Sequence, residues 1–260
     1  MRQTVTASDG VSISYRTFGS GPLSVLFVHG WMVSGAVFDD LIETLGTDGI
    51  RLIVPDQRGT GSSDRPEKGY DLAQYARDLE AVADHAQAQR FAVVGSSMGG
   101  QLALLLAATR PERVSGGVLL CPVPPSGAPL PPEMKELFRT SGGNRDKQRI
   151  ILQNVCKELS DATCDRLLDD AGKIPPACIE QAFDAWTAGF TDDVAAIRAP
   201  MLVVGTDDPA LPMDFLRQAI VERVQGAGMS YLPGPGHYPH VERPRETAAV
   251  VRAFLTALLR

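Results

Sequence analysis

A serine between two glycines, at the junction of a strand-like run and a helix-like run, constrains this chain most. The run FAVV at 91–94 is apolar, the pentapeptide GSSMG follows at 95–99, and a helix-forming stretch continues from 101 to 110. A turn this tight lifts a serine hydroxyl above the strand end only if the flanking residues lack clashing side chains. The pattern favours Ser97 as a nucleophile over the alternative, a glycine-rich connection without chemistry.

A serine nucleophile needs a base, which is oriented in turn by a third group. The chain has four histidines, His29, His85, His237 and His240. His85 lies in a polar helical stretch and is expected to be solvated. His237 and His240 lie in PGPGHYPH at 233–240, where prolines and glycines predict a loop. Because catalytic groups concentrate on loops, these two histidines are the stronger candidates.

The acid is expected at the end of another strand. The run MLVVG at 201–205 has the pattern of a buried parallel strand, and Asp207 and Asp208 follow it. Adjacent aspartates are also common in ordinary turns. The order of serine, aspartate and histidine along the chain favours a catalytic role for one of the two. The strand-like run at 114–120 carries no carboxylate, and the first acid beyond it is Glu133.

Several motifs in one order resemble the α/β-hydrolase fold superfamily. They are His29-Gly30-Trp31 as the oxyanion loop, DQRGTGSS at 56–63, the elbow at 95–99, Gly205-Thr206-Asp207-Asp208, and Gly236-His237 followed by Glu242 and Pro244. The resemblance covers residues 1–120 and 196–260. It implies that Asp208 rather than Asp207 is the acid, and that His237 rather than His240 is the base.

The same resemblance implies an oxyanion hole. Its donors would be the main-chain N–H groups of Met98, which follows the nucleophile, and Trp31, on the loop after the third strand. Donors of this kind stabilise charge that appears only in the transition state. His29 is then expected to hold the loop in place rather than to react.

The strand and helix patterns agree with that fold. Strand-like runs are expected at 4–6, 11–18, 23–28, 51–54, 91–94, 114–120, 201–204 and 229–232, and helices at 36–45, 72–89, 100–110, 213–224 and 245–259. The first two strands form a hairpin around Asp9-Gly10, and the later alternation predicts a parallel sheet. We therefore expect an α/β class protein with a mostly parallel eight-stranded sheet flanked by helices. Residues 1–125 and 195–260 would form its core domain.

The middle segment is predicted to be a helical cap, residues 126–194, inserted after the sixth strand. A proline-rich connector at 122–132 precedes helical stretches at 133–139, 145–159, 162–171 and 177–189. Apolar cap residues either pack the cap on itself or line a pocket over Ser97, and the pocket candidates are Leu137, Phe138, Trp186 and Phe190. A basic patch in the cap is Lys135, Arg139, Arg145, Lys147 and Arg149. We expect it to be a solvated helix face rather than a docking site for an acidic partner.

Composition narrows the class of protein. A chain of 260 residues with net charge −6 gives no reason to expect nucleic acid or membrane as a partner. Its four cysteines, Cys121, Cys156, Cys164 and Cys178, lack C-x-x-C spacing. They predict reduced thiols and a cytoplasmic location. The N-terminus has no signal-peptide pattern, and no metal or organic cofactor is expected.

These features together predict a serine hydrolase that acts on a small-molecule carboxylic ester or lactone. Alternatives on the same three residues are a carbon–carbon bond hydrolase and a cofactor-free perhydrolase or haloperoxidase. Carbon–carbon bond hydrolases usually carry a longer glycine-rich oxyanion loop, which this chain lacks. A serine at position 97 argues against epoxide hydrolases and haloalkane dehalogenases, which use aspartate there. A non-catalytic ligand receptor is the alternative from another class.

Overall fold

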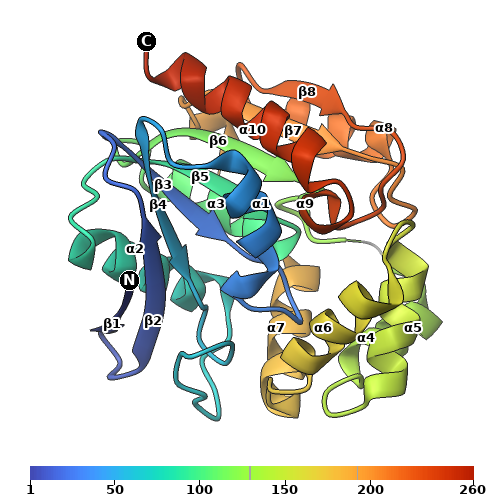
Figure 1. The fold of residues 1–260 in the computed structure, drawn as a ribbon. Helices are drawn as coiled ribbons and strands as arrows, with labels where there is room; N and C mark the ends of the chain where they lie inside the picture. The colour runs from blue at the N-terminus through green and yellow to red at the C-terminus, as the bar shows by residue number, and fades with distance from the viewer. Residues whose placement is uncertain (129, 192) are drawn as a thin grey trace.

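A twisted eight-stranded sheet forms the centre of the protein (Figure 1). The computed structural model describes residues 1–128, 130–191 and 193–260. The strand order is β1-β2-β4-β3-β5-β6-β7-β8. The strands are β1 (Arg2–Thr6), β2 (Ser12–Phe18), β3 (Leu23–Val28), β4 (Ile50–Pro55), β5 (Phe91–Ser96), β6 (Val114–Leu120), β7 (Met201–Gly205) and β8 (Gly228–Tyr231). The expected fold class, with eight strands, is confirmed.

The sheet is antiparallel at its N-terminal edge and parallel elsewhere. β1 pairs with β2, and β2 with β4, in antiparallel fashion, whereas the pairs from β3 through β8 are parallel. Residues of β5 are buried throughout, which explains its unbroken apolar sequence. Parallel strands all end at the same edge, so the loops after β3, β5, β7 and β8 meet there. Those loops carry the candidate site.

Helices cover both faces of the sheet. Figure 1 shows α1 and α10 in front of the sheet and α3 behind it. The helices outside the middle segment are α1 (Asp39–Leu45), α2 (Leu72–His85), α3 (Met98–Thr109), α8 (Met213–Leu216), α9 (Pro239–Glu242) and α10 (Pro244–Leu258), with a 3₁₀ turn at Gly35–Phe38 and a π-helical turn at Arg217–Val221. None of the helices in the described ranges is long and apolar enough to cross a membrane.

The loop after β4 is fixed by a buried ion pair. Arg58 is fully buried, and its guanidinium donates to both carboxylate oxygens of Asp78 on α2, at 2.6 and 2.8 Å. Two parallel hydrogen bonds of this kind define the orientation of both groups. The neighbouring Gln57 donates its main-chain N–H to His29 at 3.0 Å, so this loop supports the one after β3.

The middle segment forms a layer of helices beyond the carboxyl ends of the strands (Figure 1). Its helices are α4 (Pro132–Arg139), α5 (Arg145–Val155), α6 (Asp161–Ala171) and α7 (Pro176–Ala188), followed by a 3₁₀ turn at Val194–Ala196. Asp170 of α6 accepts hydrogen bonds from the main-chain N–H and the hydroxyl of Ser34, at 2.8 and 2.7 Å. The layer is thus tied to the loop after β3.

Two expectations for the middle segment need correction. α5 ends at Val155 rather than 159, because Cys156 has an extended backbone, with φ −99° and ψ 152°. The predicted connector gives its last residue, Pro132, to α4. Pro129 of that connector lies outside the described residues.

The predicted basic patch is largely neutralised, because Arg139, Arg145 and Arg149 form ion pairs with acids of α6 and α7. This pairing agrees with a solvated face.

Candidate active site

Ser97 occupies a strained turn between β5 and α3. Its backbone has φ 55° and ψ −121°, a region that residues with side chains rarely adopt. A Cβ on Gly95 would lie 2.4 Å from the carbonyl oxygen of Gly99, and one on Gly99 would lie 1.9 Å from that of Val28. The two glycines of the pentapeptide are therefore required by packing. The strain, of order 1–3 kcal/mol, places the hydroxyl at the strand ends.

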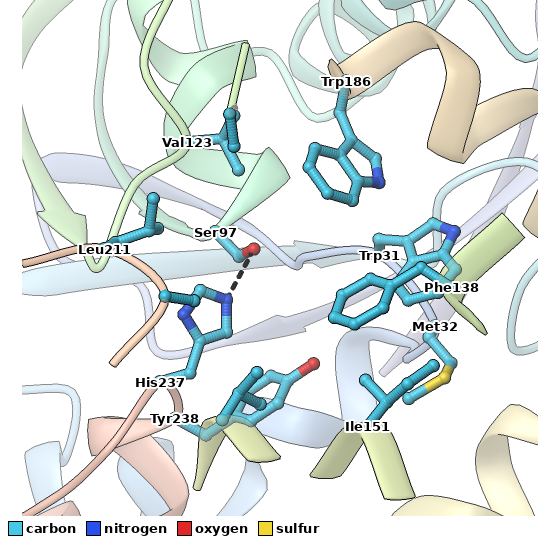
Figure 2. A pocket seen from close by; sticks show the side chains of 13 residues that line it. Trp31, Met32, Ser97, Val123, Phe138, Ile151, Trp186, Leu211, His237 and Tyr238 are labelled. Atoms are coloured by element: carbon cyan, nitrogen blue, oxygen red, sulfur yellow. Dashed lines mark hydrogen bonds between the residues drawn. The ribbon is translucent and has the colours of Figure 1, made fainter. Parts of the chain in front are cut away.

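Ser97, His237 and Asp208 form a continuous hydrogen-bonded chain. The Ser97 Oγ lies 2.8 Å from His237 Nε2, as Figure 2 shows, and His237 Nδ1 lies 2.6 Å from Asp208 Oδ2. All three residues are buried. The structure thus brings together the three residues that the sequence analysis selected, although Ser97 and His237 are 140 positions apart in the chain. The carboxylate fixes a proton on Nδ1, which leaves Nε2 free to accept the serine proton.

The two adjacent aspartates differ in their partners. Asp208 accepts from His237 and also from the main-chain N–H of Ala210 at 2.8 Å. Asp207 instead accepts from the Tyr231 hydroxyl at 2.5 Å and from the N–H of Gly234 at 3.1 Å. The Tyr231 hydrogen bond, then that from Gly234, lowers the pKa of Asp207. Asp207 therefore anchors the segment that leads to His237, and only Asp208 contacts the imidazole.

The pKa of His237 reflects two opposing influences. Burial alone would lower its pKa, because the protein interior disfavours the imidazolium. The negative charge and hydrogen bond of Asp208, with a smaller contribution from Glu242, outweigh burial and raise the pKa above its ordinary value. The imidazole is thereby made a stronger base than a free histidine.

Glu242 holds the loop that carries His237. Its Oε2 accepts main-chain hydrogen bonds from Gly236 at 3.0 Å, Lys157 at 2.7 Å and Glu158 at 2.8 Å, and its Oε1 accepts from Tyr238 at 3.1 Å. In addition, the His237 N–H donates to the Val155 carbonyl at 2.8 Å. The base is thus fastened both to its own loop and to the end of α5.

His240 was expected on a loop, but it lies in α9, a single helical turn that begins at Pro239. A proline is compatible with the first position of a helix. The His240 ring is fully buried against Phe38 and Tyr238, and neither of its nitrogens has a partner among the residues that the structure describes. Burial, and secondarily the nearby His237, lowers the pKa of His240 to about 3. It does not contact Ser97, so it is a packing residue.

The expected oxyanion donors lie on two segments that meet at Ser97. Met98 is the first residue of α3, where helix N–H groups lack intrahelical acceptors. Gly30 lies so close to Ser97 that a Cβ on it would be 3.0 Å from the serine Cβ. Trp31 follows directly, and its indole N–H donates to the Ile179 carbonyl of α7 at 2.9 Å. The loop after β3 and the first turn of α3 therefore meet at Ser97. The assignment of the Met98 and Trp31 N–H groups as oxyanion donors stays a prediction.

His29 and His85 lie outside the hydrogen-bonded chain of Ser97. His29 is fully buried and bonds to the Gly30 carbonyl and to Gln57, as expected for a residue that holds the oxyanion loop. His85 is exposed at the end of α2, where its Nδ1 lies 2.7 Å from the Tyr15 hydroxyl. Neither is positioned to accept the serine proton.

An apolar pocket of about 50 Å³ lies over Ser97 (Figure 2). Its lining residues are Trp31, Met32, Ser97, Val123, Ala128, Phe138, Ile151, Val155, Trp186, Ala210, Leu211, His237 and Tyr238. Trp31 stacks on Phe138 with ring centroids 5.5 Å apart and meets Trp186 edge-on, so aromatic residues of α4 and α7 pack on the loop after β3. None of these lining side chains is an aspartate, glutamate, lysine or arginine.

Two of the four predicted pocket residues are placed elsewhere. Phe138 and Trp186 line the pocket, whereas Leu137 and Phe190 do not. Leu137 precedes Phe138 on α4 and so points about 100° away from it around the helix. Phe190 follows α7 and is bonded through its N–H to the Pro125 carbonyl, in a separate surface groove. Sequence reasoning missed six lining residues, Met32, Val123, Ala128, Ala210, Leu211 and Tyr238. Among these, Tyr238 had a signal in the sequence, its adjacency to His237.

Cys121 is the remaining potential ligand near this site. Its Sγ, a carboxylate oxygen of Asp208 and a nitrogen of His237 all lie within 4.8 Å of one another. Burial, followed by the charge of Asp208, raises the pKa of the Cys121 thiol well above its ordinary value. A metal ion here would have to displace both that proton and the His237–Asp208 hydrogen bond. The three residues therefore fit a hydrogen-bonded base better than a metal site.

The chain is similar to several known proteins. The alpha/beta hydrolase family model matches residues 25–250. A non-heme chloroperoxidase of Streptomyces lividans is 31% identical, over 93% of this chain and 96% of that protein. A bifunctional esterase/perhydrolase of Acinetobacter calcoaceticus is 26% identical over 98% and 99%. An esterase from Exiguobacterium antarcticum superposes with a TM-score of 0.91 at 21% identity, over 98% and 100%.

Substitution of the two aspartates separately tests their assignment. Asp208→Asn is expected to lower kcat by about 10⁴-fold, because an amide no longer selects the Nδ1–H tautomer or stabilises the imidazolium. The matched Asp207→Asn variant retains an acceptor for Tyr231 and is expected to change kcat little. Steady-state kinetics on one activated ester measure both. A larger loss in Asp207→Asn would assign the acid to Asp207.

His240 is expected to make the fold sensitive to acid. Its pKa is about 3 in the folded protein and ~6.5 in the unfolded chain, so the unfolded state binds more protons below pH 6.5. Its contribution to stability should fall by about 2 kcal/mol between pH 7 and pH 5. Urea unfolding of the wild type and of His240→Phe at both pH values measures this difference. Equal losses in the two proteins would contradict it.

Proposed function

Because this chain belongs to the alpha/beta hydrolase family, we propose that it is a serine hydrolase that cleaves a small carboxylic ester or lactone. The observation that carries the proposal is the chain of hydrogen bonds from Ser97 through His237 to Asp208, at 2.8 and 2.6 Å. It joins an activated hydroxyl, a base and an orienting acid in one buried site.

The chemistry follows from these positions. His237 Nε2 takes the proton of Ser97 as Oγ attacks the substrate carbonyl carbon. The N–H groups of Met98 and Trp31 stabilise the oxyanion, and the imidazolium then gives its proton to the leaving alcohol oxygen. Water, deprotonated by His237, attacks the acyl-enzyme, which releases the carboxylic acid and restores the Ser97 hydroxyl.

The pocket supports a small and uncharged substrate. Its free volume of about 50 Å³ accommodates a short acyl group, and no lysine or arginine lines it to pair with a carboxylate. The helices α4 to α7 act as a cap that keeps water from the apolar walls. We propose that residues 126–194 work as this cap. We also propose that the protein acts in the cytoplasm.

A second candidate function uses the same acyl-enzyme. The relatives named as chloroperoxidase and as esterase/perhydrolase support it. If hydrogen peroxide replaces water as the attacking nucleophile, one of its O–H protons passes to His237 as its oxygen bonds to the acyl carbon. The bond between Ser97 Oγ and the acyl carbon then breaks, Ser97 Oγ takes the proton back from His237, and a peracid leaves in place of the acid. No change in the redox state of the protein is needed, so one site can perform both reactions.

Loss of the serine hydroxyl tests both functions together. Ser97→Ala is expected to lower ester hydrolysis by at least about 10⁴-fold, and to abolish peracid formation from a carboxylic acid and hydrogen peroxide. The wild type should be labelled by a fluorophosphonate, and the variant should not. A wild type that neither hydrolyses esters nor reacts with the probe would favour a non-catalytic receptor. If peracid formation survived in Ser97→Ala, the shared acyl-enzyme would be excluded.

The pH dependence of kcat/KM reports on the base. His237 must be neutral to accept the serine proton, and its pKa is raised mainly by Asp208. We therefore expect activity to be lost as pH falls, with a midpoint above the ~6.5 of a free histidine. Rates measured from pH 5 to 9 on an ester that carries no titrating group give this midpoint. A midpoint below 6.5 would show that burial outweighs the aspartate.

A further inference from the structure

The pocket contains a hydroxyl that the proposed reaction does not use. Tyr238 follows His237 directly, and its side chain lines the cavity over Ser97. In Figure 2 the phenolic oxygen points into that cavity, toward Phe138 and Ile151. The residue is 95% buried, with an exposed fraction of 5%. A polar group is therefore presented inside an otherwise apolar enclosure.

The Tyr238 hydroxyl has no hydrogen-bond partner within the part of the chain that the structure describes. Its main-chain N–H donates to Glu242 at 3.1 Å, which fixes the residue but leaves the phenol free. Burial, together with the nearby Cys156 and Asp208, raises the pKa of Tyr238 well above its ordinary value, so it stays protonated. Its oxygen is not one of the fully enclosed polar atoms, so it stays accessible from the cavity. A substrate oxygen placed there gains one neutral hydrogen bond, whereas a hydrocarbon in the same place leaves the hydroxyl without a partner.

The other polar groups of the lining are placed differently. Ser97 Oγ and His237 Nε2 bond to each other. The indole nitrogen of Trp186 also lacks a hydrogen-bond partner among the described residues, but it is fully enclosed by protein, and in Figure 2 it is turned away from Ser97 toward Trp31. The hydroxyl of Tyr238 thus remains to meet a substrate atom beyond the carbonyl that reacts. Because no cation lines the cavity and Asp208 lies close by, that atom is an uncharged oxygen rather than a carboxylate.

We propose that Tyr238 is a specificity-determining residue whose O–H donates a hydrogen bond to an uncharged oxygen of the substrate, an ether, hydroxyl or carbonyl group beyond the scissile ester. The proposal rests on the proposed ester hydrolysis at Ser97 and narrows its substrate class. Small oxygenated esters are favoured over hydrocarbon esters of the same shape. The oxygen can lie in the acyl or in the alcohol part, and the test distinguishes these two positions.

The experiment compares matched substrates in the wild type and in Tyr238→Phe, which removes only the hydroxyl. In the acyl arm, phenyl methoxyacetate is compared with phenyl butyrate, and in the alcohol arm, 2-methoxyethyl acetate with butyl acetate. The ratio of kcat/KM for the ether to that for the hydrocarbon cancels any general effect on the site. We expect Tyr238→Phe to lower this ratio by about 3- to 10-fold in one arm, the range for one neutral hydrogen bond.

A matched control is Tyr15→Phe, because the Tyr15 hydroxyl bonds to Gln3 and His85, away from the pocket. Its ratio should equal that of the wild type in both arms. A Tyr238→Phe ratio within about twofold of the wild type in both arms would overturn the proposal. A wild type inactive on all four esters would instead count against ester hydrolysis, the function on which the proposal rests.

Discussion

The close packing of the Ser97 turn against the loop after β3 is the constraint on which the site depends. Gly99 leaves no room for a side chain beside the Val28 carbonyl, and Gly30 lies against the Ser97 side chain. This contact brings the loop after β3 and the first turn of α3 together beside one hydroxyl. Oxyanion stabilisation depends on such preformed positions, since donors that must reorganise lose much of their effect.

A second constraint joins His237 to the helices of the middle segment. The Glu242 carboxylate accepts main-chain N–H groups from both sides of His237 and from residues 157 and 158, just after α5. Trp31, at the opposite side of the site, is held by α7 through the Ile179 carbonyl. The segment that contains α5 and α7 thus contacts both His237 and the loop after β3. In this arrangement a displacement of that segment would disturb the positions of these residues as well as the walls of the pocket.

Much of the framework follows from local sequence because its causes are local. The apolar run before Gly95 can only be a buried strand, and the small residues around Ser97 permit the turn that follows. The pocket could not be derived in the same way. Leu137 and Phe138 are adjacent and equally apolar, and only the orientation of α4 on the core decides that Phe138 faces the cavity. Phe190 was misassigned because apolar character in the sequence does not show which of two grooves a side chain lines.

The sequence by itself determined the fold class, the strained turn at Ser97 and the order in which serine, aspartate and histidine occur along the chain. The tertiary structure decided which of two aspartates meets His237, since both end the same strand and differ only in the partner that each faces. It also decided that His240 is packed as a neutral residue and that the Tyr238 hydroxyl points into the pocket. These outcomes depend on side-chain direction and on distant neighbours, which sequence spacing does not encode.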